Sequence, residues 1–124
     1  MEKVSLDAAF DSFDERWSPR IAAEVDDHAV KLAKLEGEFV WHSHAEVDEL
    51  FLVRSGELTI ELRDEPDVHL GPGELLVVPA GVEHRPVADE VAEVLLFERT
   101  GTRNTGEVED ERTTDVKRLD RTDP

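Results

Sequence analysis

The sequence predicts an all-β domain, a sandwich or small barrel, preceded by a short helix and followed by a polar tail. Short apolar or alternating runs fill residues 21–99, and Gly, Pro and Asp residues separate them. No helical pattern lies between these runs, which favours an all-β architecture. The 124 residues suit one hydrophobic core. We therefore expect a helical segment over residues 1–20, a β domain over 21–100 and a tail over 101–124.

A short amphipathic helix is expected near the N-terminus. Apolar side chains recur there at helical spacing, namely Leu6, Ala9, Phe10, Phe13 and Trp17. Ser5 or Asp7 is available as the N-cap, and Pro19 would end the run.

The predicted strands follow in order along the chain. They are the runs HAVKLAKLE, GEFVWHSH, ELFLVRSG, ELTIELRD, VHLGPGELLVVP and EVLLFER. In ELFLVRSG both faces are apolar, because Phe51 and Val53 alternate with Leu50 and Leu52. One face would fill the barrel. The other needs cover from a second sheet edge, from the N-terminal helix or from another subunit, and we expect a homodimer, with intramolecular cover as the alternative.

The last segment, residues 101–124, is polar. Its aliphatic side chains are Val108, Val116 and Leu119, which offer little area to bury against a core. We expect a mobile or surface-draped tail without a function of its own, whose removal from residue 106 onward leaves the barrel folded.

The charge balance restricts the partners. With 14 basic and 31 acidic residues the formal net charge is −17. Nucleic acids and anionic membrane surfaces are therefore disfavoured, since both are bound through basic patches. The excess of carboxylates predicts a halophilic-type protein that folds best at high salt, where counterions screen the self-repulsion.

Cysteine is absent, which excludes disulfides, thiolate metal sites and cysteine nucleophiles. Any bound metal would be held by nitrogen and oxygen. The N-terminal residues lack the apolar core of a signal peptide, and no apolar run approaches the ~20 residues of a membrane span. We expect a cytoplasmic protein.

Two histidines one residue apart stand in GEFVWHSH. On a strand, His42 and His44 leave the same face and can converge on one point. A buried imidazole needs a partner, because an unpaired polar group costs on the order of 1–3 kcal/mol. The pair therefore indicates a cation site, and a hydrogen-bonded pair without metal is the alternative.

A carboxylate near the pair could complete such a site. Strand parity favours Glu46, whereas Glu49 would face the site only if a turn intervenes over residues 45–48. Further on, an apolar run ends in a Pro79-Ala80-Gly81 corner that would aim His84. The remaining histidines, His28 and His69, lie in polar surroundings, where we expect them to be exposed and without chemistry.

Two segments together resemble a known family. The spacing Gly37-x4-His42-x-His44-x4-Glu49-x6-Gly56 is similar to the first cupin motif, and Gly73-x5-Pro79-x-Gly81-x2-His84 is similar to the second. The segments stand in the expected order, 16 residues apart, and the resemblance spans residues 37–88. Ala88 stands where the second motif usually ends in asparagine.

The resemblance implies a double-stranded β-helix, or jelly-roll barrel, with a metal inside its mouth. It implies His42, His44, Glu49 and His84 as ligands. Three imidazoles and one carboxylate suit Mn, Fe, Ni, Co or Zn better than Ca or Mg. The family implies a metal-dependent enzyme acting on a small metabolite, of dioxygenase or sugar-isomerase type. The alternative is a non-catalytic small-molecule or sugar-binding protein with a structural metal. Phe97 or Arg99 is expected to shape ligand selectivity.

Overall fold

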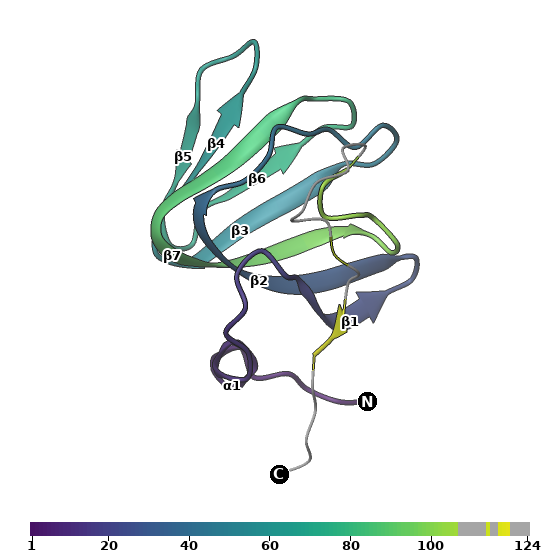
Figure 1. Cartoon of the computed structure of the whole chain (residues 1–124). Coiled ribbons are helices and arrows are strands. Elements are labelled where there is room, and N and C mark those ends of the chain that lie inside the picture. Colours follow the sequence, from purple (N-terminus) through teal and green to yellow (C-terminus); the bar gives the residue numbers. More distant parts are fainter. Residues whose placement is uncertain (107–113, 115–116, 120–124) are drawn as a thin grey trace.

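The computed structural model describes residues 1–106, 114 and 117–119. Within these residues the chain forms one short helix and eight strands (Figure 1). They are α1 (Leu6–Asp11), β1 (Arg20–Val25), β2 (His28–Glu38), β3 (Glu49–Ser55), β4 (Leu58–Leu62), β5 (Val68–Leu70), β6 (Leu75–Val78), β7 (His84–Arg99) and β8 (Lys117–Arg118). The predicted all-β fold is confirmed.

The long strand β7 organises the sheet. It has 16 residues, and β2 runs antiparallel beside almost its whole length. On its other edge, the first part of β7 pairs with β4 and the second part pairs with β3. Figure 1 shows β7 turning back at one side of the molecule, so that its two parts lie in two layers. The layers enclose the core, with β5 beyond β4, β6 beyond β3 and β1 beyond β2.

The core lies between these layers because inward positions alternate with outward ones. Val53 on β3, Leu58 and Ile60 on β4, and Val94 on β7 are each 0% exposed. A second, smaller cluster lies outside the sheet, where Phe10 and Phe13 pack against Ala22 and Leu32. The N-terminal segment therefore covers part of the outer face.

Helix α1 is shorter than the sequence predicts. The Ser5 hydroxyl accepts a hydrogen bond from the Ala8 amide at 3.3 Å and is the N-cap, but the helix ends at Asp11 rather than near Trp17. Trp17 has a φ of 58°, which a right-handed helix does not allow. Its indole N–H donates to the Glu36 carbonyl at 2.8 Å, and its ring stacks on Phe39 at 4.6 Å. Tertiary contacts therefore override the helical spacing.

The run GEFVWHSH does not form a strand of its own. Strand β2 continues through Gly37, at φ 85°, and ends at Glu38. Beyond it, only His42 makes a ladder contact, as an isolated bridge to His84. The predicted strand over residues 37–44 is thus wrong, although the backbone of His42 is paired with that of His84.

The described part of residues 101–124 makes ordered contacts with the β domain. Strand β8 pairs in parallel with β1, and the Leu119 amide donates to the Ile21 carbonyl at 2.9 Å. Thr105 is 0% exposed. Strand pairing and hydrogen bonds fix this segment, which composition alone does not reveal because they require little apolar area. Val108 and Val116 lie outside the described residues.

Gly106 fits tightly against the loop that carries the histidine pair. A Cβ atom at this position would come within 2.1 Å of the Ser43 carbonyl oxygen and 3.3 Å of the His42 ring. Its φ is +59°, which also disfavours a side chain. The segment after β7 therefore lies directly against the His42–His44 loop.

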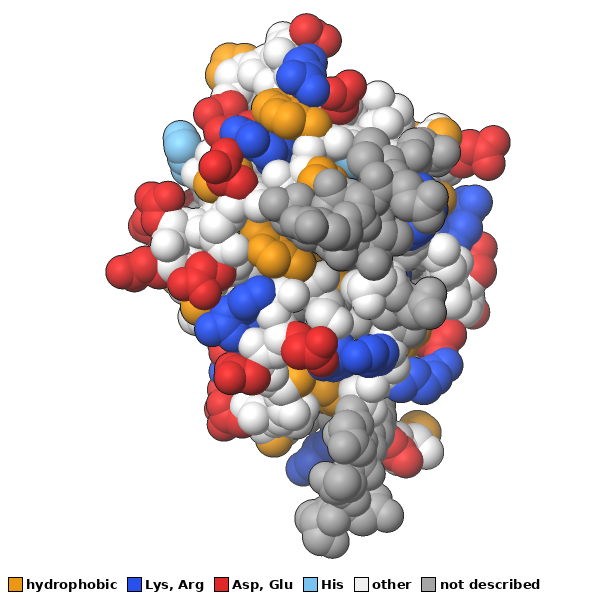
Figure 2. All heavy atoms as spheres, in the orientation of Figure 1, with side chains coloured by type: hydrophobic (Ala, Val, Ile, Leu, Met, Phe, Trp, Pro, Cys, Tyr) orange, Lys and Arg blue, Asp and Glu red, His pale blue; other side chains and the backbone are white. Residues whose placement is uncertain are grey.

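The surface agrees with the acidic composition. Figure 2 shows carboxylates spread over the visible face, with Lys and Arg side chains placed among them. Several form ion pairs, such as Arg85 with Glu38 and Glu61. Among the described residues, none of the helices has the length and apolar character needed to cross a membrane.

Candidate metal centre

The four residues expected to meet come from three places in the chain. His42 lies opposite His84, the first residue of β7, and their backbones exchange hydrogen bonds of 3.0 and 2.9 Å. Glu49 is the first residue of β3. His44 lies between β2 and β3, where its carbonyl accepts from the Gly81 amide at 2.8 Å. Paired backbone therefore positions the histidines.

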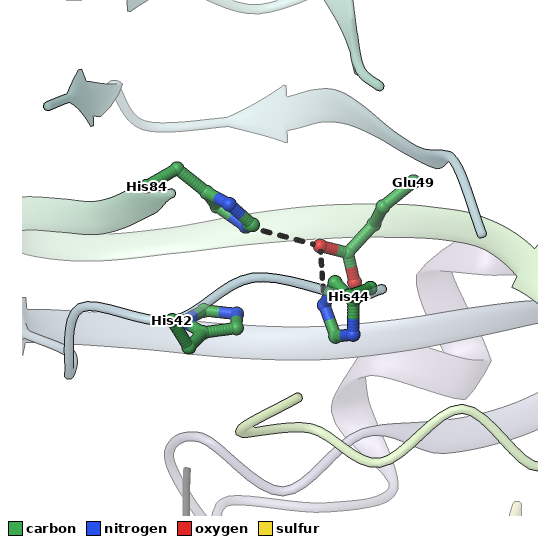
Figure 3. Close-up of side chains that lie close together, drawn as sticks. All are labelled: His42, His44, Glu49 and His84. Atoms are coloured by element: carbon green, nitrogen blue, oxygen red, sulfur yellow. Dashed lines mark ion pairs between the residues drawn. The ribbon is translucent and has the colours of Figure 1, made fainter. Parts of the chain in front are cut away.

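Figure 3 shows the four side chains pointing toward one another. Each offers one ligand atom, and these atoms all lie within 4.8 Å of one another. His44 Nε2 and His84 Nε2 lie 3.3 and 3.4 Å from Glu49 Oε1. All four residues are buried, with exposures between 0% and 5%. The geometry is that of a group that could hold one metal ion.

Backbone carbonyls fix the tautomers of two of the imidazoles. The Nδ1 atoms of His42 and His84 each lie 2.9 Å from a carbonyl oxygen, that of Val40 and that of Val82. A carbonyl only accepts hydrogen bonds, so each Nδ1 carries the proton and donates it. The Nε2 lone pairs are then left free, which is the state a metal ligand requires.

The centre contains polar atoms without hydrogen-bond partners. His44 Nε2, Glu49 Oε1 and His84 Nε2 are buried and form no hydrogen bond with the residues that the structure describes. Orphaned buried polar atoms are rare and costly. Three of them converging on one point fit a cation, since the donor set is imidazole nitrogen and carboxylate oxygen.

The charge states suit a cation as well. Burial lowers the pKa of His42 from 6.5 to about 4, and the adjacent His84 contributes, so this imidazole is neutral at pH 7. Burial alone would raise the pKa of Glu49. The imidazoles of His44 and His84, which lie close to the carboxylate, outweigh this effect and hold the Glu49 pKa well below its usual range. A neutral imidazole beside an ionised carboxylate is a metal-binding state.

The structure decides between the two candidate carboxylates. Glu46 is exposed, whereas Glu49 is buried in the cluster. The chain bends at residues 45 and 46, which changes the parity after His44. The Asp48 carboxylate accepts from the Ala80 amide at 2.9 Å and ties this connection to the Pro79–Gly81 corner.

The corner before β7 aims His84 as predicted. Gly81 adopts a φ of 82°, and the Val82 amide donates to the Pro79 carbonyl at 3.2 Å, which closes the turn. The other two histidines lie outside the cluster. His69 is exposed and within 2.8 Å of the Thr59 hydroxyl, while His28 is partly exposed and stacks on Phe97.

A cavity of about 30 Å³ adjoins the cluster inside the barrel. Its lining includes His42 and Glu49, several apolar side chains, and the charged residues Lys31 and Glu98. Burial and the nearby Glu49 carboxylate raise the pKa of Glu98, and the Lys31 ammonium, which stabilises the ionised form, opposes this shift. The cavity is thus part polar and part apolar, as a site for a small molecule is.

Sequence reasoning missed Lys31 and Glu98. It named Phe97 or Arg99 as selectivity residues. Phe97 stacks on His28, and Arg99 is exposed and lines a surface pocket together with His44. Glu98 stands between them and points to the opposite face. The alternation of β7 could have identified Glu98, because this residue follows Val94 and Leu96 on the inward face of the strand.

Comparison with known proteins places the chain in a family. The model for the cupin domain, Cupin_2, matches residues 28–98, which is more than half of the chain and includes the whole cluster. The Bacillus subtilis protein YdbB is 44% identical over 63 residues, covering 51% of this chain and 56% of YdbB. The chain therefore aligns with little more than half the length of this relative.

Solved structures share the fold. A cupin-2 domain protein from Shewanella frigidimarina is 45% identical, with a TM-score of 0.75 over 77% of this chain and 93% of that one. Hydroquinone 1,2-dioxygenase from Sphingomonas sp. TTNP3, solved with 4-hydroxybenzoate bound, has a TM-score of 0.66 at 18% identity, over 71% of this chain and 68% of that one, which shows likeness in fold alone. With its jelly-roll sheet, its buried histidine and glutamate cluster and the matching family model, the chain belongs to the cupin family.

Proposed function

We propose that His42, His44, Glu49 and His84 bind one divalent transition metal ion, and that this ion serves an enzyme acting on a small metabolite. The observation that carries the proposal is the convergence of three buried polar atoms that lack hydrogen-bond partners among the described residues. Mn, Fe, Ni, Co and Zn accept such a donor set. When bound, the ion would supply Lewis acidity and, if it is iron, a site for dioxygen.

Room for a ligand supports the enzyme. Four protein ligands leave two positions on a six-coordinate ion. The cavity beside His42 and Glu49 provides about 30 Å³, and a single water needs about 10–15 Å³ on this measure. Apolar walls such as Phe51 and Leu96 lower the local dielectric and strengthen the polarisation of whatever binds there.

A non-catalytic binding protein is the second candidate, with a metal that has a structural role. It is favoured by the enclosure of the centre, since all four residues are at most 5% exposed and Gly106 lies against the His42–His44 loop. Loading the protein with cobalt and titrating keto acids, sugar phosphates and diphenols would separate the two. Spectral change with turnover supports the enzyme, and spectral change without turnover supports the binding protein.

Elemental analysis tests the metal itself. We expect about one equivalent per chain in the wild type and a sharp fall in the His44→Ala/His84→Ala double variant. The matched control is His28→Ala/His69→Ala, which removes two histidines outside the cluster and should retain the metal. Equal metal content in all three proteins would contradict the assignment.

A homodimer through the outer face of β3 and β6 completes the proposal. Leu50 lies opposite Val77 and Leu52 opposite Leu75 in the paired strands. Leu75 and Val77 are 56% and 45% exposed, an unusual position for aliphatic neighbours. Light scattering would test this, with Leu75→Lys/Val77→Lys expected to give a monomer. The acidic composition further supports a protein that does not bind nucleic acid.

A further inference from the structure

A lysine and a glutamate form an ion pair inside the barrel, next to the proposed metal centre. Lys31 Nζ, on β2, lies 2.9 Å from Glu98 Oε1, on β7. Their side chains are 1% and 3% exposed. Both line the cavity that also contacts His42 and Glu49.

Stability does not account for this pair. Removing two charges from water costs several kcal/mol per ion, and replacing a buried ion pair by apolar side chains of similar volume is often neutral or stabilising, by about 1–4 kcal/mol. The neighbouring inward positions on β2, Ala29 and Ala33, are small and fully buried, and Ala33 lines the same cavity as Lys31. A charged pair kept buried in the wall of this cavity is therefore a candidate for ligand binding.

The pair has unused hydrogen-bonding capacity. An ammonium has three donors, and among the described residues Lys31 Nζ has two acceptors, Glu98 Oε1 and the Thr102 carbonyl at 3.3 Å. Glu98 Oε2 is buried and accepts no hydrogen bond from the described residues. The cavity wall thus presents one free donor and one free acceptor close together.

We propose that Lys31 and Glu98, together with the neighbouring metal centre, form a binding site for small α-hydroxy carboxylates such as glycolate. This inference rests on the metal centre proposed above. A metal at the centre would hold the hydroxyl oxygen and one carboxylate oxygen of such a ligand. Lys31 would donate a hydrogen bond to the second carboxylate oxygen, and Glu98 Oε2 would accept a hydrogen bond from the hydroxyl group.

The chemistry selects against simpler ligands. A plain carboxylate such as acetate offers acceptors for Lys31 and no donor for Glu98, whereas a diol such as ethylene glycol offers a donor but no charge for Lys31. A cavity of about 30 Å³ also favours the smallest members of the class.

Ligand binding to the cobalt-loaded full chain tests the inference. Glycolate, acetate and ethylene glycol are titrated while the visible spectrum and the heat of binding are recorded, and cobalt content is measured for each protein. The test variant is Lys31→Met/Glu98→Leu, which removes the pair without leaving an unpaired charge. We expect its affinity for glycolate to fall about tenfold or more, the usual effect of losing a hydrogen bond to a charged group.

The control is Lys34→Met, which removes a lysine on the same strand that donates to the Phe13 carbonyl outside the cavity. It should bind glycolate as the wild type does. A wild type that retains cobalt but binds no glycolate, or a double variant that binds it within about threefold of the wild type, would overturn the inference alone. Loss of cobalt from the double variant would also overturn it. A wild type that fails to retain cobalt would contradict the proposed metal centre itself.

Discussion

The two ends of the barrel interior differ although the same strands build them. On β3, Phe51 and Val53 point into an apolar core, and Glu49 points into the polar centre from the same face. On β7, Val94 and Leu96 are followed by Glu98 on that face. The apolar end stabilises the fold by burying area, whereas the polar end buries charged and unpaired groups at a cost. Packing explains the apolar end, and the proposed metal and ligand binding would explain the polar end.

The largest effect is expected where the polar end loses one charge of a pair. Lys31→Met leaves Glu98 buried without its cation and should lower the free energy of unfolding by about 3–5 kcal/mol. Lys31→Met/Glu98→Leu should recover most of that loss. Chemical denaturation of both variants measures the difference, and a double variant as unstable as the single one would show that the pair supports the fold.

A cavity created in the apolar end should lower the stability of the fold. Ile60 is 0% exposed, and Ile60→Ala should lower the free energy of unfolding by about 2–5 kcal/mol while leaving metal content unchanged. Thr59→Ala, on the same strand but partly exposed, is the control and should change stability little. Loss of metal from a folded Ile60→Ala protein would show that packing at the apolar end also determines metal binding at the polar end.

The polar end should also respond to pH when metal-free. His42 has its pKa lowered to about 4 in the folded state, so the unfolded chain binds the proton more tightly. The stabilisation by neutral His42 is therefore present above pH 6.5 and is lost as the pH falls toward 4, by about 3 kcal/mol in total. Denaturation of the metal-free protein across this range measures it. His42→Asn should flatten the dependence, and an unchanged slope would contradict the assignment.

A smaller effect is expected where the C-terminal segment touches the centre. Gly106→Ala places a Cβ against the Ser43 carbonyl at a positive φ and should lower the free energy of unfolding by about 1–3 kcal/mol. Metal affinity should fall with it, since the displaced loop carries both His42 and His44. Gly101→Ala, also at positive φ but with open space around its Cβ, separates backbone strain from the close contact. Equal metal affinity in both variants would show that the contact is irrelevant to the centre.

Salt should act on the surface rather than on either end. The net charge of −17 repels itself until counterions screen it, so the thermal midpoint should rise from low to high KCl. The same rise is expected in Ile60→Ala, because that substitution changes no charge. A midpoint that stays flat or falls would contradict the expectation.

The fold class and the proposed ligand set were predictable because each depends on local order. Apolar and alternating runs located β2, β3, β4 and the second half of β7, and the spacing around His42 and His84 identified two matching motifs. Parity alone favoured Glu46, and only the bend at residues 45 and 46 brings Glu49 into the cluster. That choice came from the family resemblance rather than from the residues.

Features fixed by distant contacts could not be predicted in this way. Trp17 leaves the helical pattern to stack on Phe39, and Thr105 is buried in a segment whose composition is that of a tail. Lys31 and Glu98 are 67 positions apart in the sequence, so no local pattern indicates that they form a pair. The alternation along each strand places Lys31 and Glu98 on inward-facing positions. Only the pairing of β2 with β7 brings these two side chains together.

The most direct test of the polar end is X-ray absorption spectroscopy on the zinc-loaded protein. We expect scattering from three imidazoles, with zinc–nitrogen distances of about 2.0–2.1 Å, and from one carboxylate oxygen. His84→Ala should lower the count to two imidazoles, and His69→Ala should leave three. A wild-type spectrum with one imidazole or none would contradict the proposed metal centre.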